Sequence, residues 1–293
     1  AEFIGMPVLA SMMALDAFPN DHPLYGYATG SKGTKSGIQI SRKADVVLAL
    51  GTRFADESTC SYKKGVAWNF GPDETDTRLI QVDIDPHEIG KNYPVDVGIL
   101  GDIKAVCRDL LDVLQKNYPK PEYHTSSYFK EIQQYRTEWK EFIHSWAKPQ
   151  IEPVMISCVL HEIRAFLDRN AIVVTSSGNV QAQIIQEFEF YEPYTNITAG
   201  GFSTMGYTLP ASLGAKLAAP NRQVIGLVGD GDFMMTMQEL HTAKQLNLNV
   251  VIVVLNNSAW MAITDLQRAM YGEERGYATE FYDQKHEIYT PNF

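Results

Sequence analysis

The sequence predicts an α/β protein with two doubly wound parallel-sheet domains. Three observations lead to this class: short apolar runs without polar alternation, helical patterns between these runs, and a length of 293 residues. Continuous apolar runs are typical of parallel strands that are buried on both faces. Strands that alternate with helices form parallel sheets covered by helices. The length allows two domains, each with its own core.

The first domain is predicted over residues 1–118. Its strands are expected at residues 6–10, 45–50, 78–85 and 97–100, where apolar runs lie between turn residues. A helix is expected over residues 103–118, because apolar residues recur there at three- and four-residue spacing. The first strand comes so early that we expect the start of this domain to be truncated.

Residues 119–152 interrupt the alternation and are predicted to form a linker. Prolines stand near both ends, and residues 128–146 form a charged, aromatic-rich helix that we expect to lie over both domains. The second domain is predicted over residues 153–293, with its end also expected to be truncated. Its elements are expected at residues 154–167 (helix), 171–175 (strand), 224–228 (strand), 232–246 (helix), 250–255 (strand) and 262–271 (helix).

Composition and charge restrict the partners of the chain. Hydrophobic residues make up 45% and charged residues 20%, as in an ordinary globular protein. The formal net charge is −10, and the isoelectric point is about 5.2. An acidic chain without a basic patch argues against nucleic acid and against an anionic membrane. If such a chain binds a diphosphate, it needs a local cation.

Targeting signals and cysteine chemistry give no sign of export. The three cysteines, Cys60, Cys107 and Cys158, lie far apart and lack metal-binding spacing, as in a reducing compartment. No apolar stretch approaches the roughly 20 residues needed to span a bilayer, and no signal peptide is recognisable. We therefore expect a cytoplasmic protein.

Two short motifs predict a metal site. Gly229-Asp230-Gly231 follows the apolar run 224–228, and Asn256-Asn257 follows the run 250–255. Either motif alone is ordinarily a turn. A right-handed crossover, however, brings the carboxyl ends of the two strands side by side. The carboxylate and amide oxygens suit Mg²⁺ or Ca²⁺, and Mg²⁺ usually completes its shell with phosphate and water. The pair therefore predicts a metal-bridged phosphate or diphosphate.

These motifs, together with the text from Gly206 to Ala215, resemble thiamine-diphosphate-dependent enzymes of the acetolactate synthase and pyruvate oxidase group. The resemblance implies a central Rossmann-like domain followed by a diphosphate-binding domain. The first half also resembles sulfoacetaldehyde acetyltransferase, on segments that lie before the paired asparagines. Those segments are Asp16-Ala17-Phe18-Pro19, His22-Pro23-Leu24, Gly30-Ser31-Lys32 and residues 44–53.

The resemblance implies a role for each residue of the predicted site. The metal ligands are the side chains of Asp230 and Asn257 and the backbone carbonyl of Ala259. Glycines at 229 and 231 let the backbone approach the phosphate. Asp232 is expected either to cap the following helix or to lie near the phosphate. The remaining diphosphate contacts are expected at Ser177, Gly178, Asn179 and Val180, where related synthases carry Gln-His in place of Asn179-Val180.

Two further residues are implied to bind the ring end of the cofactor. Met205 matches the bulky apolar residue that bends it, although a core methionine is the ordinary alternative. The backbone carbonyl of Ser203 is implied to accept a hydrogen bond from its amino group. Glu239 and His241 lie in the helix 232–246 and are expected to be noncatalytic. The buried face of that helix is expected to comprise Phe233, Met237, Leu240 and Ala243.

The implied reaction is decarboxylation of a 2-oxo acid, followed by transfer of the acyl carbanion to an acceptor such as a second oxo acid or an aldehyde. Thiamine diphosphate and Mg²⁺ are the implied cofactors. The activating glutamate is expected outside this chain, so the catalytic residues are unknown and the 293 residues alone are expected to be inactive. A homo-oligomer, dimer or tetramer, is implied. The alternative of another class is a noncatalytic cofactor-binding subunit that needs a partner.

FAD is a possible further cofactor. In flavin-bearing relatives, segments similar to Gly51–Phe54, Asp83–Pro86 and Gly101-Asp102 contact FAD, with the arginine corresponding to Arg53 near its pyrophosphate. Similar segments occur in relatives without flavin. Arg53 is therefore expected either to contact FAD or only to tie loops together.

Overall fold

The computed structural model describes residues 1–73, 76–148, 152–272 and 279–293. The chain forms two compact units, which are described separately. The first comprises residues 1–12 and 21–144, and the second comprises residues 13–20 and 145–293. Residues 149–151 of the predicted linker lie outside the described residues. No helix in the described ranges is long and apolar enough to cross a membrane.

The first unit contains two small parallel sheets. Its strands are β1 (Val8–Ala10), β2 (Tyr25–Ala28), β3 (Val46–Leu50), β4 (Arg78–Asp83) and β5 (Val97–Leu100). The four strands predicted from the sequence are confirmed. The sequence did not predict β2, because its Tyr-Gly-Tyr-Ala run is only four residues long and contains glycine and alanine, which are depleted in strands. β1 pairs with β2, whereas β3, β4 and β5 form a separate sheet in that order.

Helices cover these strands. They are α1 (Lys35–Lys43), α2 (Asp56–Thr59), α3 (Ile103–Asn117) and α4 (Ser127–Trp146), with the 3₁₀ turns η1 (Met12–Ala14) and η2 (Tyr123–Thr125). Asp102 caps α3 by accepting a hydrogen bond of 3.0 Å from the amide of Ala105.

The helix α4 has a buried face that the sequence analysis did not recognise. Ile132, Tyr135, Arg136 and Trp139 recur at helical spacing along this face and are buried. Within the first unit, Ile132 and Tyr135 pack with Ile40 of α1. The face was missed because an arginine and two aromatic residues occupy three of its four positions.

The second unit is a doubly wound α/β domain. Its strands β6 (Ile172–Thr175), β7 (Asn196–Thr198), β8 (Val224–Gly229) and β9 (Val251–Leu255) form a parallel sheet in the order β7-β6-β8-β9. The helices are α5 (Ile156–Phe166), α6 (Asn179–Glu187), α7 (Thr208–Ala218), α8 (Asp230–Thr236), α9 (Leu240–Gln245) and α10 (Met261–Tyr271). The 3₁₀ turns are η3 (Gly200–Phe202) and η4 (Met237–Glu239).

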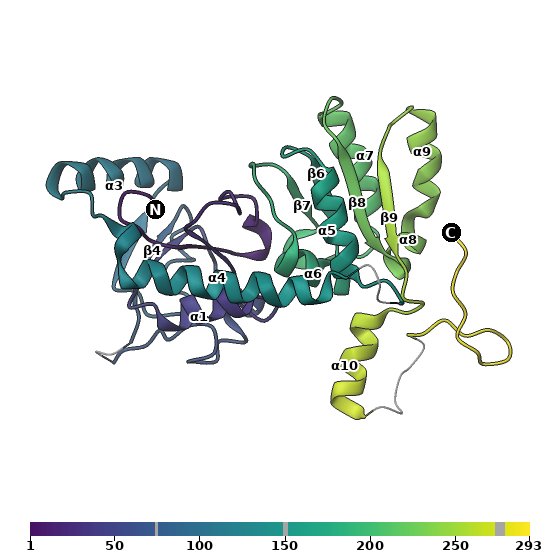
Figure 1. The fold of residues 1–293 in the computed structure, drawn as a ribbon, viewed down its shortest axis with the longest axis horizontal. Helices are drawn as coiled ribbons and strands as arrows, with labels where there is room; N and C mark the ends of the chain where they lie inside the picture. The colour runs from purple at the N-terminus through teal and green to yellow at the C-terminus, as the bar shows by residue number, and fades with distance from the viewer. Residues whose placement is uncertain (74–75, 149–151, 273–278) are drawn as a thin grey trace. The chain divides into compact units, whose positions relative to one another are not determined.

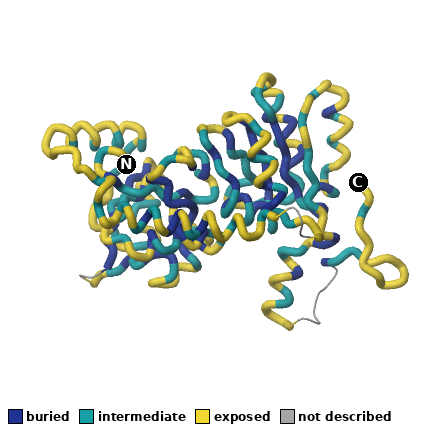
Figure 2. The backbone as a smooth tube through the Cα atoms, in the orientation of Figure 1, coloured by how far each residue is buried: buried dark blue, intermediate teal, exposed yellow. Residues whose placement is uncertain are grey.

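The core of the second unit lies along its central strands (Figure 2). β6 is buried throughout, and all residues of β8 except Gly229 are buried. On one face, Leu209 and Leu213 of α7 pack with Val228, Phe233 and Ala243. Helices α5 and α6 contact each other, and α6 contacts β8 (Figure 1). The α/β class predicted from the apolar runs is therefore confirmed.

One predicted helix is broken in the structure. Instead of a single helix over residues 232–246, the chain forms α8, η4 and α9. The predicted buried face is only half correct, because Phe233 and Ala243 are buried whereas Met237 is 50% exposed and Leu240 is 46% exposed. The 3₁₀ turn rotates the second half of the segment, so a single 3.6-residue period does not describe it.

Candidate functional site

The predicted site lies at the carboxyl edge of the second sheet. Thr175, Gly229 and Leu255 end the strands β6, β8 and β9, and Gly229 is aligned with Leu255. β6 lies between β7 and β8. The chain leaves β6 towards β7 on one side and later returns to form β8 on the other side, so the strand order reverses at β6. Ligands of open α/β sheets bind at such a switch point, outside the carboxyl ends of the strands.

Asp230 joins the ends of two neighbouring strands. Its side chain is only 2% exposed. One carboxylate oxygen accepts hydrogen bonds of 3.2 Å from the backbone amides of Asn257 and Ala259, and the other accepts one of 2.8 Å from the amide of Gly231. The structure thus brings together the three residues that the sequence selected as metal ligands.

The oxygen donors at this edge suit a hard cation. An ionised carboxylate offers about four lone pairs, and the three amide bonds to Asp230 leave one for a metal. Asn257, the second predicted ligand, is exposed. Within the described ranges, no group of three or more His, Cys, Asp or Glu side chains could hold a metal. The predicted set has one such residue and relies on amide and carbonyl oxygens for the others.

The glycines of the site differ in what surrounds them. Gly178 has a φ of 85°, which side-chain-bearing residues rarely adopt, and space beside it is open. Gly229 also faces open space. At Gly231 a Cβ would lie 1.9 Å from the indole ring of Trp260. Glycine is therefore required at position 231 because Trp260 packs closely against it, which the sequence did not indicate.

Asp232 does not cap the helix as one prediction proposed. The helix α8 already begins at Asp230, and Asp232 lies inside its first turn. Its carboxylate is 4% exposed. It accepts hydrogen bonds from the hydroxyls of Ser176 and Thr208 and from the amide of Gly206. Asp232 is thus a buried junction between three segments.

The segment that contains Ser203 and Met205 lies between η3 and α7. Ser203 has a left-handed backbone with a φ of 49°, and its hydroxyl donates to the side chain of Gln181 over 3.3 Å. Gln181 is 1% exposed and donates over 2.8 Å to Thr198, at the end of β7. Met205 is half-buried, so it is not fully enclosed as a core methionine would be.

The remaining predicted residues, Ser177 to Val180, lie after β6: Ser177 and Gly178 precede α6, and Asn179 and Val180 begin it. Ser177 and Gly178 are half-buried, and Val180 is 5% exposed. The side chain of Asn179 donates over 3.3 Å to Asp265 of α10. Asn179 therefore contacts a helix that follows the paired asparagines, which the sequence did not indicate.

Sequence reasoning missed Ser176, Gln181 and Trp260. Gln181 carried a usable signal, because it shares the buried face of α6 with Ile184 and Ile185. A polar side chain on an apolar helix face needs a buried partner. Ser176 and Trp260 carried no such signal, since their contacts depend on segments distant in sequence.

Glu239 and His241 belong to η4 and α9, not to the loops at the strand ends. Glu239 accepts a hydrogen bond of 2.8 Å from Thr242, one turn further along the chain. His241 is exposed. Neither placement gives these residues a role at the strand ends.

The first unit has its own carboxyl edge, at the ends of β3, β4 and β5. Arg53 is exposed there, and its backbone carbonyl accepts a hydrogen bond of 2.8 Å from Asn92. This contact ties the loop after β3 to the segment after β4. FAD binding stays a prediction, which flavin absorbance of the purified protein would test.

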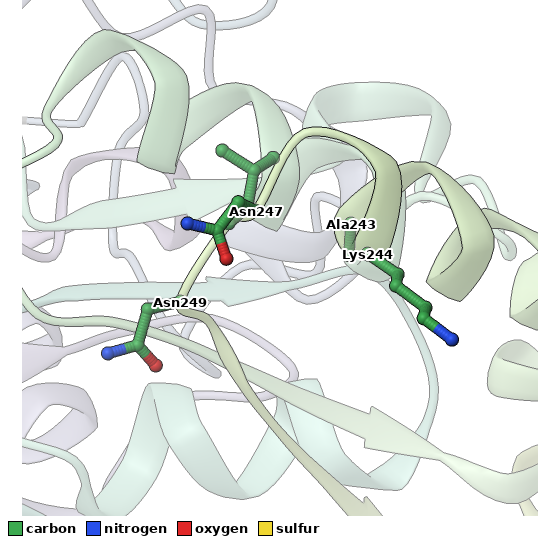
Figure 3. A pocket seen from close by; sticks show the side chains of 5 residues that line it. Ala243, Lys244, Asn247 and Asn249 are labelled. Carbon is green, nitrogen blue, oxygen red and sulfur yellow. The ribbon is translucent and has the colours of Figure 1, made fainter.

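A pocket of about 500 Å³ lies elsewhere in the second unit (Figure 3). It is lined by Ala243, Lys244, Asn247, Leu248 and Asn249, in the connection between α9 and β9. This connection precedes β9, whereas the predicted site follows it. The pocket is therefore separate from the predicted cofactor site.

A parallel sheet with acidic and amide residues at its switch point is typical of α/β proteins that bind a ligand at this edge. Comparison with known families specifies this further. Residues 1–110 match the central domain of thiamine pyrophosphate enzymes, and residues 176–290 match their C-terminal TPP binding domain. The chain belongs to the family of thiamine pyrophosphate enzymes.

Individual relatives agree with this assignment. The chain is 35% identical over 275 residues to a probable acetolactate synthase large subunit of Methanocaldococcus jannaschii, covering 94% of the chain and 45% of that protein. It is 31% identical over 293 residues to an acetolactate synthase of Mycobacterium leprae, covering 100% of the chain and 45% of that protein. The chain thus spans about half the length of the curated relatives it matches.

Proposed function

We propose that this chain is the cofactor-binding part of a thiamine-diphosphate- and Mg²⁺-dependent enzyme that decarboxylates a 2-oxo acid and transfers the acyl group, as acetolactate synthase does. Family membership and the names of the relatives support the reaction class. The observation that carries the proposal is Asp230, whose buried carboxylate lies against the amides of Asn257 and Ala259.

In this proposal the metal ligands are a carboxylate oxygen of Asp230, the side-chain oxygen of Asn257 and the backbone carbonyl of Ala259. The divalent ion would offset the negative charge of the diphosphate in a chain whose net charge is −10. Ser177 to Val180 and the turn Gly229-Asp230-Gly231 would surround the diphosphate. The open space at Gly178 and Gly229 is consistent with close approach of a ligand.

The ring end of the cofactor would lie against Ser203 and Met205. Met205 would hold the two rings bent, and the carbonyl of Ser203 would accept a hydrogen bond from the amino group. When bound, thiamine diphosphate supplies the electron sink for decarboxylation. We propose that the activating glutamate belongs to a pyrimidine-binding domain outside these 293 residues, and that the protein is a homo-oligomer.

The test of this function uses the full-length protein. We expect pyruvate to be consumed and acetolactate to form only when Mg²⁺ and thiamine diphosphate are both present. Formation of acetyl phosphate and sulfite from sulfoacetaldehyde and phosphate, without carboligation, would support the alternative transferase. If neither reaction occurs although the cofactor binds, the noncatalytic-subunit alternative is favoured.

A further inference from the structure

Asp232 connects parts of the site that are distant in sequence. Ser176 follows β6, Gly206 precedes α7, and Thr208 is the first residue of α7. All three donate to the same carboxylate, and the Thr208 bond is 2.9 Å long. A buried carboxylate without hydrogen-bond donors is costly, so these three donors fix both Asp232 and the segments that supply them.

The turn after β8 therefore has two carboxylates with different partners. Asp230 holds the loop after β9, whereas Asp232 holds the loop after β6 and the segment before α7. The two residues are separated only by Gly231. One short turn therefore carries the contacts to the loops after β9 and β6 and to the segment before α7.

The segment before α7 is anchored at both ends. Gln181 binds Thr198 and Ser203 at its start, and Asp232 binds Gly206 at its end. Ser203 and Gly206 both have positive φ, at 49° and 77°. Left-handed conformations persist where the surrounding contacts fix them, and these two anchors are such contacts.

We infer that Asp232 is a positioning residue, which sets the segment Ser203–Gly206 relative to the metal-binding turn. This inference rests on the proposed function, since it assigns the ring end of the cofactor to Ser203 and Met205 and the diphosphate end to Asp230. Asp232 itself contacts neither end. Its carboxylate is directed at protein donors, and a second carboxylate next to the diphosphate would repel it.

The test separates the two ends of the cofactor. Calorimetry on the full-length protein compares Mg²⁺-thiamine diphosphate with Mg²⁺-pyrophosphate, which lacks the rings. For Asp232→Asn we expect about a 10-fold loss of thiamine diphosphate affinity, as for other outer-shell residues, and a change of less than about twofold for pyrophosphate. Equal losses for both ligands, or no loss for thiamine diphosphate, would overturn the inference.

Two further variants keep the test decisive. Thr208→Val removes one donor to Asp232 and should give the same selectivity with a smaller loss, about threefold; it carries the test if Asp232→Asn does not fold. Asp230→Ala should lose both ligands. If Asp230→Ala retains pyrophosphate binding, the proposed metal site is wrong, whereas the selectivity of the Asp232 and Thr208 variants still decides the role of Asp232.

Discussion

At the carboxyl edges of the two main sheets, buried side chains connect the loops that follow the strands, but these side chains differ in charge. In the first unit, the buried amide of Gln81 donates to the carbonyls of Thr52 and Glu88 and accepts from the amide of Gly90. In the second unit, the carboxylates of Asp230 and Asp232 connect the loops. An amide offers both donors and acceptors and closes its network without charge, whereas a carboxylate only accepts.

The two edges differ in the negative charge that a bound cation would offset. In the part of the chain that the structure describes, none of the observed ion pairs involves Asp230 or Asp232. Two buried carboxylates held only by neutral donors carry charge that a bound divalent ion would offset. At the edge of the first unit, Gln81 connects the loops after β3 and β4 through neutral hydrogen bonds.

Replacing Asp230 should have the largest effect on the affinity for thiamine diphosphate. For Asp230→Ala we expect the affinity for thiamine diphosphate to fall by more than about 100-fold, because even outer-shell residues of metal sites contribute about 10–100-fold. Calorimetry with Mg²⁺ and thiamine diphosphate measures it.

Asp83 supplies the matched control in the first unit. It is buried at the end of β4 and accepts a hydrogen bond of 2.9 Å from the amide of Asp85. Asp83→Ala should lower Tm without changing the affinity. Equal affinity losses in both variants would show that the two edges do not differ as proposed.

Gly231 tests the packing of Trp260 on the acidic turn. Gly231→Ala places a Cβ 1.9 Å from the indole ring, so we expect a loss of about 1–3 kcal/mol in the free energy of unfolding. Chemical denaturation monitored by tryptophan fluorescence measures it. Gly229→Ala is the control, because open space surrounds that position. If both variants are equally stable, Trp260 does not pack as described.

Gln81→Met tests the hydrogen bonds of Gln81 at the carboxyl edge of the first unit. Gln81→Met keeps the volume but removes the amide, which leaves the backbone groups of Thr52, Glu88 and Gly90 without this partner. We expect a stability loss of about 1–2 kcal/mol and no change in thiamine diphosphate affinity. Gln134→Met is the control, since Gln134 is an exposed residue of α4. A loss of cofactor affinity in Gln81→Met would contradict the proposed division of tasks.

The smallest expected effect concerns a carboxyl group outside both edges. Burial raises the pKa of Glu187, although hydrogen bonds from Ser157 and Gln183 partly offset this. Its second oxygen is buried without a partner. The raised pKa means that stability is full below the unfolded-state pKa and is lost as pH rises through the folded-state pKa.

Glu187→Gln should therefore raise Tm at pH 8 by roughly 2 °C and have little effect at pH 4. Thermal unfolding at both pH values measures the difference. Glu162→Gln is the control, because Glu162 is an exposed residue of α5; it should show no pH-dependent gain in Tm. A gain that is larger at pH 4 than at pH 8 would reverse the assigned sign.

Much of this protein was predictable from local sequence patterns. The apolar runs identified the parallel strands β3, β4, β6, β8 and β9, because strands of parallel sheets are rich in continuous apolar residues. Ala259 entered only through the family resemblance, whereas the spacing between Gly229-Asp230-Gly231 and Asn256-Asn257 itself indicated that Asp230 and Asn257 would meet. That inference needed only the handedness of a crossover between neighbouring parallel strands.

Only the tertiary structure decided which polar groups serve these strand ends. The pairing of β1 with β2, the packing of Trp260 on Gly231 and the three donors to Asp232 join segments that are separated along the chain. Local propensity and periodicity carry no information about such partners. They are selected when the folded chain buries a polar group or closes a gap, because a buried charge must find donors and a core must be filled.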